Sequence, residues 1–103
     1  MSTERRKYPR VAYPLEAAWR SGGASSACRI GDLSLGGCFV SGLAAPGKGA
    51  VVEISVRVGD DMLTFNGHVV SLEHSIGFAV EFRNLSIQQR THIQQILDAV
   101  TTG

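Results

Sequence analysis

The sequence predicts an all-β domain: a six-stranded antiparallel β-barrel with a C-terminal α-helix and an extended N-terminal tail. Short apolar runs recur along residues 11–82 and are separated by glycine, proline and aspartate, as in antiparallel sheets. No helical period lies between these runs, which excludes a parallel βαβ arrangement and favours a small barrel. The apolar period becomes helical only near the end of the chain. A length of 103 residues suits one domain with one core.

Residues 1–10 are expected to form a flexible tail, and residues 11–103 the barrel domain. The tail is polar and charged and has no apolar periodicity. Pro9 also disfavours a helical conformation at Tyr8, because the proline ring crowds the preceding residue. The tail should therefore be extended or disordered until a ligand binds.

Six runs have the length and composition of strands. The expected strands cover residues 11–20, 27–33, 38–42, 51–58, 62–74 and 76–82. Pro14 removes a ladder donor, so the first strand should lie at an edge or be irregular near its start. The sequence SGGASS at 21–26 is expected to be a loop, and Ser34–Gly37 and the segment 44–49 are expected to be the next two connections.

The clearest alternation is VVEISVRV at 51–58, where every second residue is valine or isoleucine. Such a strand buries one face and exposes the other. The inward residues are expected to be Val52, Ile54, Val56 and Val58, together with Ile76, Phe78, Val80 and Phe82 of the last strand. Gly67 is expected to mark a bulge or bend, and Trp19 is expected in the core or at the barrel rim.

A helix is expected at about 87–100. Its apolar residues at helical spacing are Ile93, Ile96, Leu97 and Val100. Ser86 and Gln89 match a capping box that would start the helix at Ile87. This helix should cover one end of the barrel.

The charge is small overall and unevenly distributed. The formal net charge is +1, yet residues 1–10 carry four basic residues and one acidic residue, which leaves −2 on residues 11–103. Non-specific binding to DNA or RNA requires many simultaneous phosphate contacts, and a slightly acidic body does not supply them. A small anionic ligand suits such a local basic cluster better.

Several other functional classes are disfavoured. No stretch approaches the roughly 20 apolar residues that span a bilayer, and the N-terminus has no apolar signal region, so a cytoplasmic protein is expected. Cys28 and Cys38 are expected to be buried thiols without a disulfide or metal. His68 and His74 share a strand face but belong to no closed ligand set. No nucleophile, base and orienting group can be assembled, so the protein is expected not to be an enzyme.

The segment RRKYPR contains an RxxxR spacing at Arg6 and Arg10. In an extended chain these two arginines project to the same side and Arg5 to the other. A guanidinium can bind phosphate with two donors, bind the O6 and N7 edge of guanine, or stack on a purine. Taken alone, such a segment is also explained as a solvated basic tail.

The segment DLSLGG contains a DxSxxG spacing at Asp32, Ser34 and Gly37. Asp and Ser side chains bind nearby backbone N–H groups, and Gly36 with Gly37 would permit positive φ and close ligand approach. Such a turn can offer N–H groups and a hydroxyl to phosphate, while Asp32 could accept from guanine or hold an arginine. Taken alone, the segment is also explained as an ordinary turn between strands.

The two motifs together, about twenty residues apart and followed by GFAVEF at 77–82, resemble the PilZ family of bacterial cyclic di-GMP receptors. The resemblance implies the barrel and C-terminal helix described above. It implies that Arg6 and Arg10 bind cyclic di-GMP against Asp32, Ser34 and Gly37, with Gly36 in support. Arg5 occupies a position that the family associates with two ligand molecules per chain.

By the same resemblance, ligand binding would order the tail and change the interaction with an unidentified downstream protein. A monomer is expected, and the downstream process is not indicated. Ser71 departs from many relatives, which have an aromatic residue there; loss of a stacking surface would cost about 1 to 3 kcal/mol per base. The alternative is an adaptor of the same fold that binds a protein partner without nucleotide.

Overall fold

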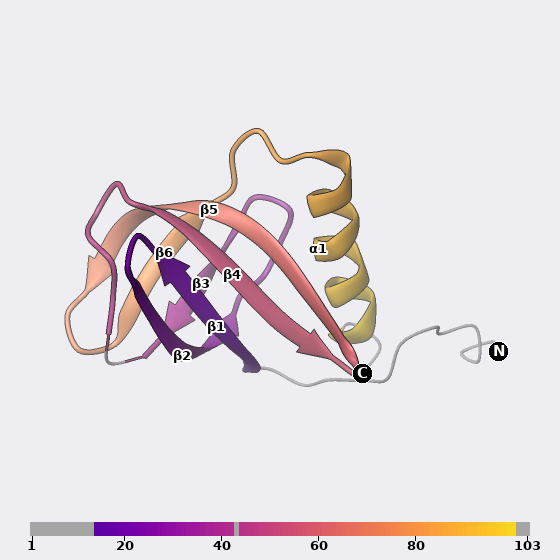
Figure 1. Cartoon of the computed structure of the whole chain (residues 1–103), viewed down its shortest axis with the longest axis horizontal. Coiled ribbons are helices and arrows are strands. Elements are labelled where there is room, and N and C mark those ends of the chain that lie inside the picture. Colours follow the sequence, from indigo (N-terminus) through magenta and orange to yellow (C-terminus); the bar gives the residue numbers. More distant parts are fainter. Residues whose placement is uncertain (1–13, 43, 101–103) are drawn as a thin grey trace, which may run out of the picture.

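The computed structural model describes residues 14–42 and 44–100, which form a closed six-stranded antiparallel barrel and one helix (Figure 1). The strands are β1 (Leu15–Ser21), β2 (Ala24–Gly31), β3 (Gly37–Ser41), β4 (Val51–Val58), β5 (Asp61–Glu73) and β6 (Gly77–Glu81), and the helix is α1 (Ile87–Val100). Their order around the barrel is β1-β2-β3-β6-β5-β4, and β4 closes onto β1. The predicted fold class is confirmed for the described part of the chain.

The connection between β1 and β2 is shorter than predicted. Ser21 pairs with Ala24, so only two glycines form the turn, and the expected loop over 21–26 is wrong. Gly22 has a φ of 58°, a left-handed conformation that glycine adopts without steric cost and that tight hairpins require. The serines and alanine after it can therefore join the ladder and extend β2 toward its N-terminus.

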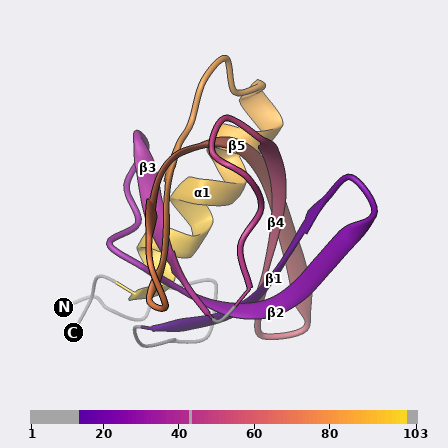
Figure 2. The same ribbon diagram turned by 90° about the vertical axis from the view of Figure 1, so that its left-hand side faces the viewer.

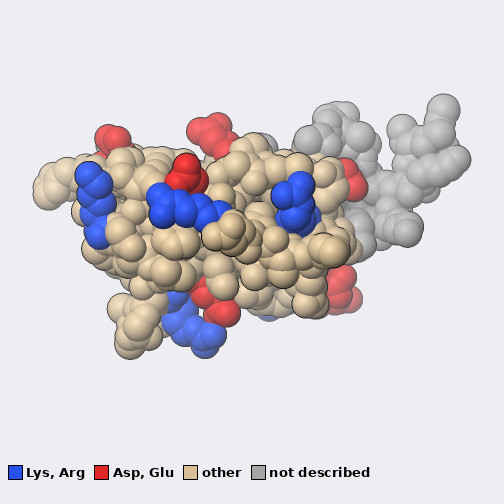
Figure 3. All heavy atoms as spheres, turned by 90° about the horizontal axis from the view of Figure 1, so that it is seen from above, with Lys and Arg blue, Asp and Glu red and all other residues tan. Residues whose placement is uncertain are grey.

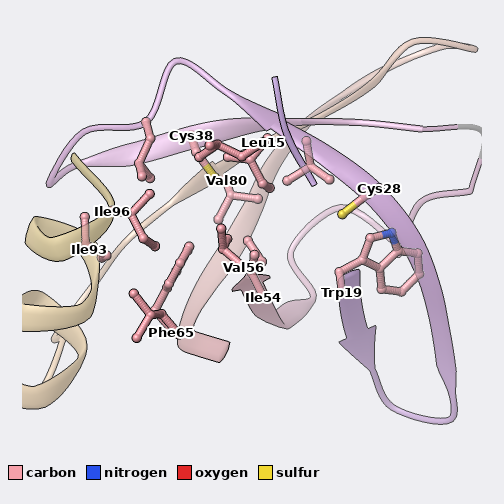
Figure 4. Packing of buried hydrophobic residues seen from close by; sticks show 14 of the residues in the cluster. Leu15, Trp19, Cys28, Cys38, Ile54, Val56, Phe65, Val80, Ile93 and Ile96 are labelled. Carbon is pink, nitrogen blue, oxygen red and sulfur yellow. The ribbon is translucent and has the colours of Figure 1, made fainter. Parts of the chain in front are cut away.

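The barrel interior is filled by alternate residues of the strands and by one face of the helix (Figure 4). The expected inward face of β4 is confirmed, because its alternate valines and isoleucine are at most 1% exposed. Trp19 is buried, as expected, and meets Phe78 edge to face at 6.0 Å between ring centroids; Phe65 and Phe82 form a second such pair at 5.2 Å. Such pairs add to the stabilisation from burial alone.

Cys28 and Cys38 are confirmed as buried free thiols. Burial raises the pKa of Cys28 to about 11, with a smaller contribution from Glu16. Burial also raises the pKa of Cys38 to about 12, with a smaller contribution from Cys28. Both side chains therefore act as small apolar groups at neutral pH.

Two details of β5 and β6 differ from the prediction. Ile76 was expected to point inward but is 60% exposed, because it lies in the turn before β6 begins at Gly77. The register shift of β5 falls between Val69 and Ser71 and not at Gly67. Gly67 instead permits close packing, since a Cβ there would lie 2.2 Å from Cγ1 of Val80.

Helix α1 begins at Ile87, as predicted, and the N–H of Gln89 donates to the hydroxyl of Ser86 over 3.1 Å. The reciprocal half of the capping box is absent: the Gln89 side-chain oxygen accepts from the N–H of Asn66 over 2.9 Å. In the end-on view the helix lies behind the ring of strands (Figure 2). It thus covers one end of the barrel, with Ile93 and Ile96 fully buried.

The same helix covers an open edge of β5. β6 pairs with β5 only from His68 onward, which leaves the first half of β5 without a strand on that side. Besides the Gln89 bond to Asn66, the Nδ1 of His92 lies 2.9 Å from the carbonyl oxygen of Thr64 and must donate to it. Side chains of α1 therefore satisfy backbone groups that would otherwise form an exposed sheet edge.

Residues 14–42 and 44–100 contain no helix with the length and hydropathy of a membrane span.

Candidate ligand-binding site

The turn between β2 and β3 is held in one conformation by its own hydrogen bonds. The N–H of Ser34 donates to the carbonyl of Gly37 over 2.9 Å, and the N–H of Gly36 donates to the Ser34 hydroxyl over 3.1 Å. Asp32 begins the turn with a φ of 50°, a left-handed conformation that aspartate tolerates better than most residues. We call residues 32–37 the site turn.

The site turn is also anchored to the barrel from two sides. Leu33 is buried in the core at 7% exposure, although both of its neighbours are exposed. The carbonyl of Gly36 accepts from the N–H of Phe82 over 2.9 Å, which extends the ladder between β3 and β6. The anchored turn therefore presents Asp32 and Ser34 to solvent from a rigid base.

The two glycines differ from the sequence-based expectation, because neither has a positive φ; the left-handed residue is Asp32. Gly37 belongs to β3, where a Cβ would lie 2.2 Å from the backbone oxygen of Val80. At Gly36 the nearest atom to such a Cβ would be the Ser34 hydroxyl oxygen at 3.7 Å. Gly37 is thus required by the close approach of β3 and β6, and Gly36 leaves space above the turn.

The carboxylate of Asp32 is exposed and has no hydrogen-bond or ion-pair partner within residues 14–42 and 44–100. A carboxylate that only accepts hydrogen bonds can receive the N–H groups of a guanine edge or a guanidinium. Its side chain is therefore available for either of the two roles that the sequence left open.

The arginines of the RxxxR motif, Arg6 and Arg10, and the preceding Arg5 lie outside the described residues. The structure brings together Asp32, Ser34, Gly36 and Gly37, and it does not test their proximity to these arginines. Among the described residues, Leu15 at the start of β1 pairs with Ile30, two residues before Asp32.

Two arginines close to the site turn in the sequence or on the neighbouring strands form ion pairs with glutamates. Arg83, next to Phe82, donates to Glu81 over 2.7 Å, and Arg29 on β2 lies 3.4 Å from a carboxylate oxygen of Glu16. On the face shown in Figure 3, basic and acidic side chains are interspersed and form no broad basic area.

Sequence reasoning missed a hollow of about 270 Å³ between the site turn and α1. The residues that line it are Leu35, Ile87, Arg90, Thr91 and Gln94. The sequence signal for it was the second leucine of the turn, Leu35, which is 41% exposed whereas Leu33 is buried. Among the described residues, no cluster of three or more His, Cys, Asp or Glu side chains could hold a metal ion.

A closed six-stranded antiparallel barrel with a helix over one end defines a class of small β-barrel domains. The model of one family within this class, the PilZ domain, matches residues 4–99. The chain belongs to the PilZ domain family.

Solved structures agree with this assignment at the level of the fold. The PilZ domain of CeSA from a cellulose-synthesizing bacterium superposes with a TM-score of 0.67 and 18% identity, over 84% of this chain and 92% of that one. The PlzA protein of Borreliella burgdorferi, solved in complex with c-di-GMP, gives a TM-score of 0.61 and 17% identity. That match covers 93% of this chain and 37% of PlzA. A search of curated proteins gave no match.

Proposed function

We propose that this chain is a non-catalytic receptor for cyclic di-GMP, and that the ligand is held between the N-terminal arginines and the site turn. The observation that carries the proposal is the membership of residues 4–99 in the PilZ family, with both the RxxxR and the DxSxxG spacing intact. The PlzA protein, part of which shares this fold, was solved in complex with c-di-GMP.

The site turn supplies the rigid half of the proposed site. Its conformation is set by backbone hydrogen bonds and by burial of Leu33, so little conformational entropy is lost there on binding. The free carboxylate of Asp32 can accept from guanine N1–H and N2–H, and the Ser34 hydroxyl can reorient toward a phosphate oxygen. Loss of the long 3.5 Å contact from this hydroxyl to the Gly37 carbonyl costs little.

The tail supplies the positive charge that the turn lacks. The ligand carries two phosphates, whereas residues 11–103 have a formal charge of −2 and residues 1–10 one of +3. One bidentate arginine contact is worth about 1 to 3 kcal/mol, while micromolar affinity needs about 8 kcal/mol. Arg6 and Arg10 therefore require the turn as a second surface, and neither half suffices alone.

The chain can bring the two halves together. Arg10 precedes Leu15 by five residues, a span of at most about 18 Å when extended, and Leu15 lies beside the end of β2 that leads into Asp32. On this proposal the ligand orders the tail over the site turn, and the new surface is what a downstream protein partner recognises. Arg5 would serve a second ligand molecule, which gives a stoichiometry of two per chain.

Isothermal titration of the purified chain with cyclic di-GMP tests the proposal and measures the stoichiometry. Arg6→Ala and Arg10→Ala should each weaken binding roughly 5- to 150-fold. Arg20→Ala is the matched control, because Arg20 is an exposed arginine at the opposite end of β1 and should leave affinity unchanged. Absence of heat and of any shift in thermal midpoint at micromolar ligand would refute the proposal.

Proteolysis or hydrogen exchange then tests the tail. Residues 1–10 should become protected when cyclic di-GMP is added, and the Arg6→Ala chain should lose this protection. Protection that is the same with and without ligand would contradict ordering of the tail. Binding of a protein partner that is indifferent to cyclic di-GMP would favour the adaptor function instead.

A further inference from the structure

Phe39 differs from every other aromatic residue that the structure describes. Residues 14–42 and 44–100 contain five aromatic side chains, and four of them belong to the buried core: Trp19, Phe65, Phe78 and Phe82. Phe39 is partly exposed and lies between the buried Cys38 and Val40 on β3, so its side chain points away from the core. Packing of the interior therefore does not explain an aromatic residue here.

The surface around Phe39 is built from small residues. In register with it are Gly31 on β2, Ala79 on β6 and, one strand further, Ser71 on β5. Its ring leans over Gly77, where a Cβ would lie 3.0 Å from Cε2 of Phe39. The ring is thus supported from below by β6, and none of these in-register neighbours has a large side chain that could cover it.

Phe39 also lies on β3, the strand that follows the site turn. It follows Gly37 by two residues on the same face of β3, which places the two Cα atoms about 6.6 Å apart. Its ring leans toward Gly77, which pairs with Ser41 two residues further from the turn, so a ligand that contacts the turn must have the length of a dinucleotide to reach the ring. The unpartnered carboxylate of Asp32 at the start of the turn would then orient the edge of a base whose face meets Phe39.

We propose that Phe39 is a binding residue of the site and provides the aromatic surface on which a guanine of cyclic di-GMP stacks. This inference rests on the proposed function and adds an aromatic stacking surface for a base, which neither sequence motif contains. A base stacks on an aromatic ring only where no bulky side chain blocks the face of that ring. The small residues of β2, β5 and β6 in register with Phe39 meet this condition.

The test measures cyclic di-GMP affinity for Phe39→Leu and Phe39→Trp by calorimetry. Leucine keeps the apolar character but removes the π face, so affinity should fall roughly 5- to 150-fold. Tryptophan should keep affinity within a few-fold, and its fluorescence should change on binding, whereas the buried Trp19 of the parent chain should not respond. Met62→Ala, which removes another half-exposed apolar side chain on β5, is the matched control and should bind as the parent does.

The outcomes separate the two proposals. If the parent chain binds and Phe39→Leu binds equally well, the stacking role is wrong and the receptor function stands. If the parent chain does not bind, the receptor function fails and the stacking role fails with it. If Phe39→Leu lowers the thermal midpoint, Phe39→Trp decides: a purely structural role predicts that the larger ring also weakens binding and gives no fluorescence response, which would overturn the proposal.

Discussion

Replacement of Gly37 by alanine tests whether the last glycine of the DxSxxG motif serves the fold. In the structure a Cβ at Gly37 would lie 2.2 Å from the backbone oxygen of Val80 and 3.3 Å from its carbonyl carbon. The neighbouring atoms belong to the main chain of β6, so no side-chain rotation relieves the clash. β3 and β6 must move apart along a ladder in which Gly37 pairs with Glu81.

The expected cost follows from that geometry. Overpacking by one carbon in a site that cannot relax costs about 1 to 3 kcal/mol. For a domain of this size each kcal/mol lowers the thermal midpoint by about 4 to 8 °C, so Gly37→Ala should lower it by roughly 4 to 24 °C. Gly36→Ala is the matched control, because its Cβ would meet nothing nearer than 3.7 Å and Gly36 has no positive φ.

Thermal unfolding followed by circular dichroism compares the two variants without ligand. Gly36→Ala should be neutral or slightly more stable than the parent, because alanine restricts the unfolded chain. The reasoning would be refuted if the two variants melted within about 2 °C of each other. That result would mean that β3 and β6 separate freely at this point and that Gly37 serves only the ligand.

Two further predictions concern the helix and the thiols. Gln89→Ala removes the acceptor of the Asn66 N–H and should cost about 0.5 to 1.5 kcal/mol, with faster amide exchange at Asn66 by NMR; Gln88→Ala should change neither. Because burial raises the pKa values of Cys28 and Cys38 from 9.0 to about 11 and 12, the unfolded chain loses these protons first as pH rises. The free energy of unfolding should therefore fall between pH 9 and 11, by up to about 1.4 kcal/mol per pH unit for each thiol. The double variant Cys28→Ala/Cys38→Ala should show a smaller dependence of this free energy on pH. An equal dependence in the parent and the variant would contradict the prediction.

Much of the barrel could be predicted because its strands alternate clearly. The valines and isoleucine of β4 show a period of two, and the buried residues of α1 show a helical period, so both elements and their inner faces follow from the sequence. The turn at Gly22 could not be placed from composition, because serine and glycine suit a long loop and a tight hairpin equally. Ile76 was assigned to the interior because the alternation of β6 was extended to the residue before the strand begins at Gly77.

The motif located the site turn in the sequence, but it did not show which residue of the turn has which structural role. Positive φ was assigned to the glycines, whereas it falls on Asp32, because only the register of β3 with β6 shows that Gly37 is extended. Phe39 was not singled out, since in the sequence it lies between two other apolar residues and only pairing separates their faces. Long-range contacts such as Gln89 with Asn66 have no local signal.

The structure divides the DxSxxG motif into residues that build the turn and residues that face solvent. Leu33 and Gly37 are fixed by the core and by β6, so their substitution acts first on stability. Asp32 and Ser34 are exposed on that support, so their substitution should act first on binding. The same motif can therefore persist in a relative that has lost its ligand, because part of it is needed for folding. An intact turn therefore does not by itself distinguish a receptor from such a relative, and substitution of the tail arginines is the more informative test.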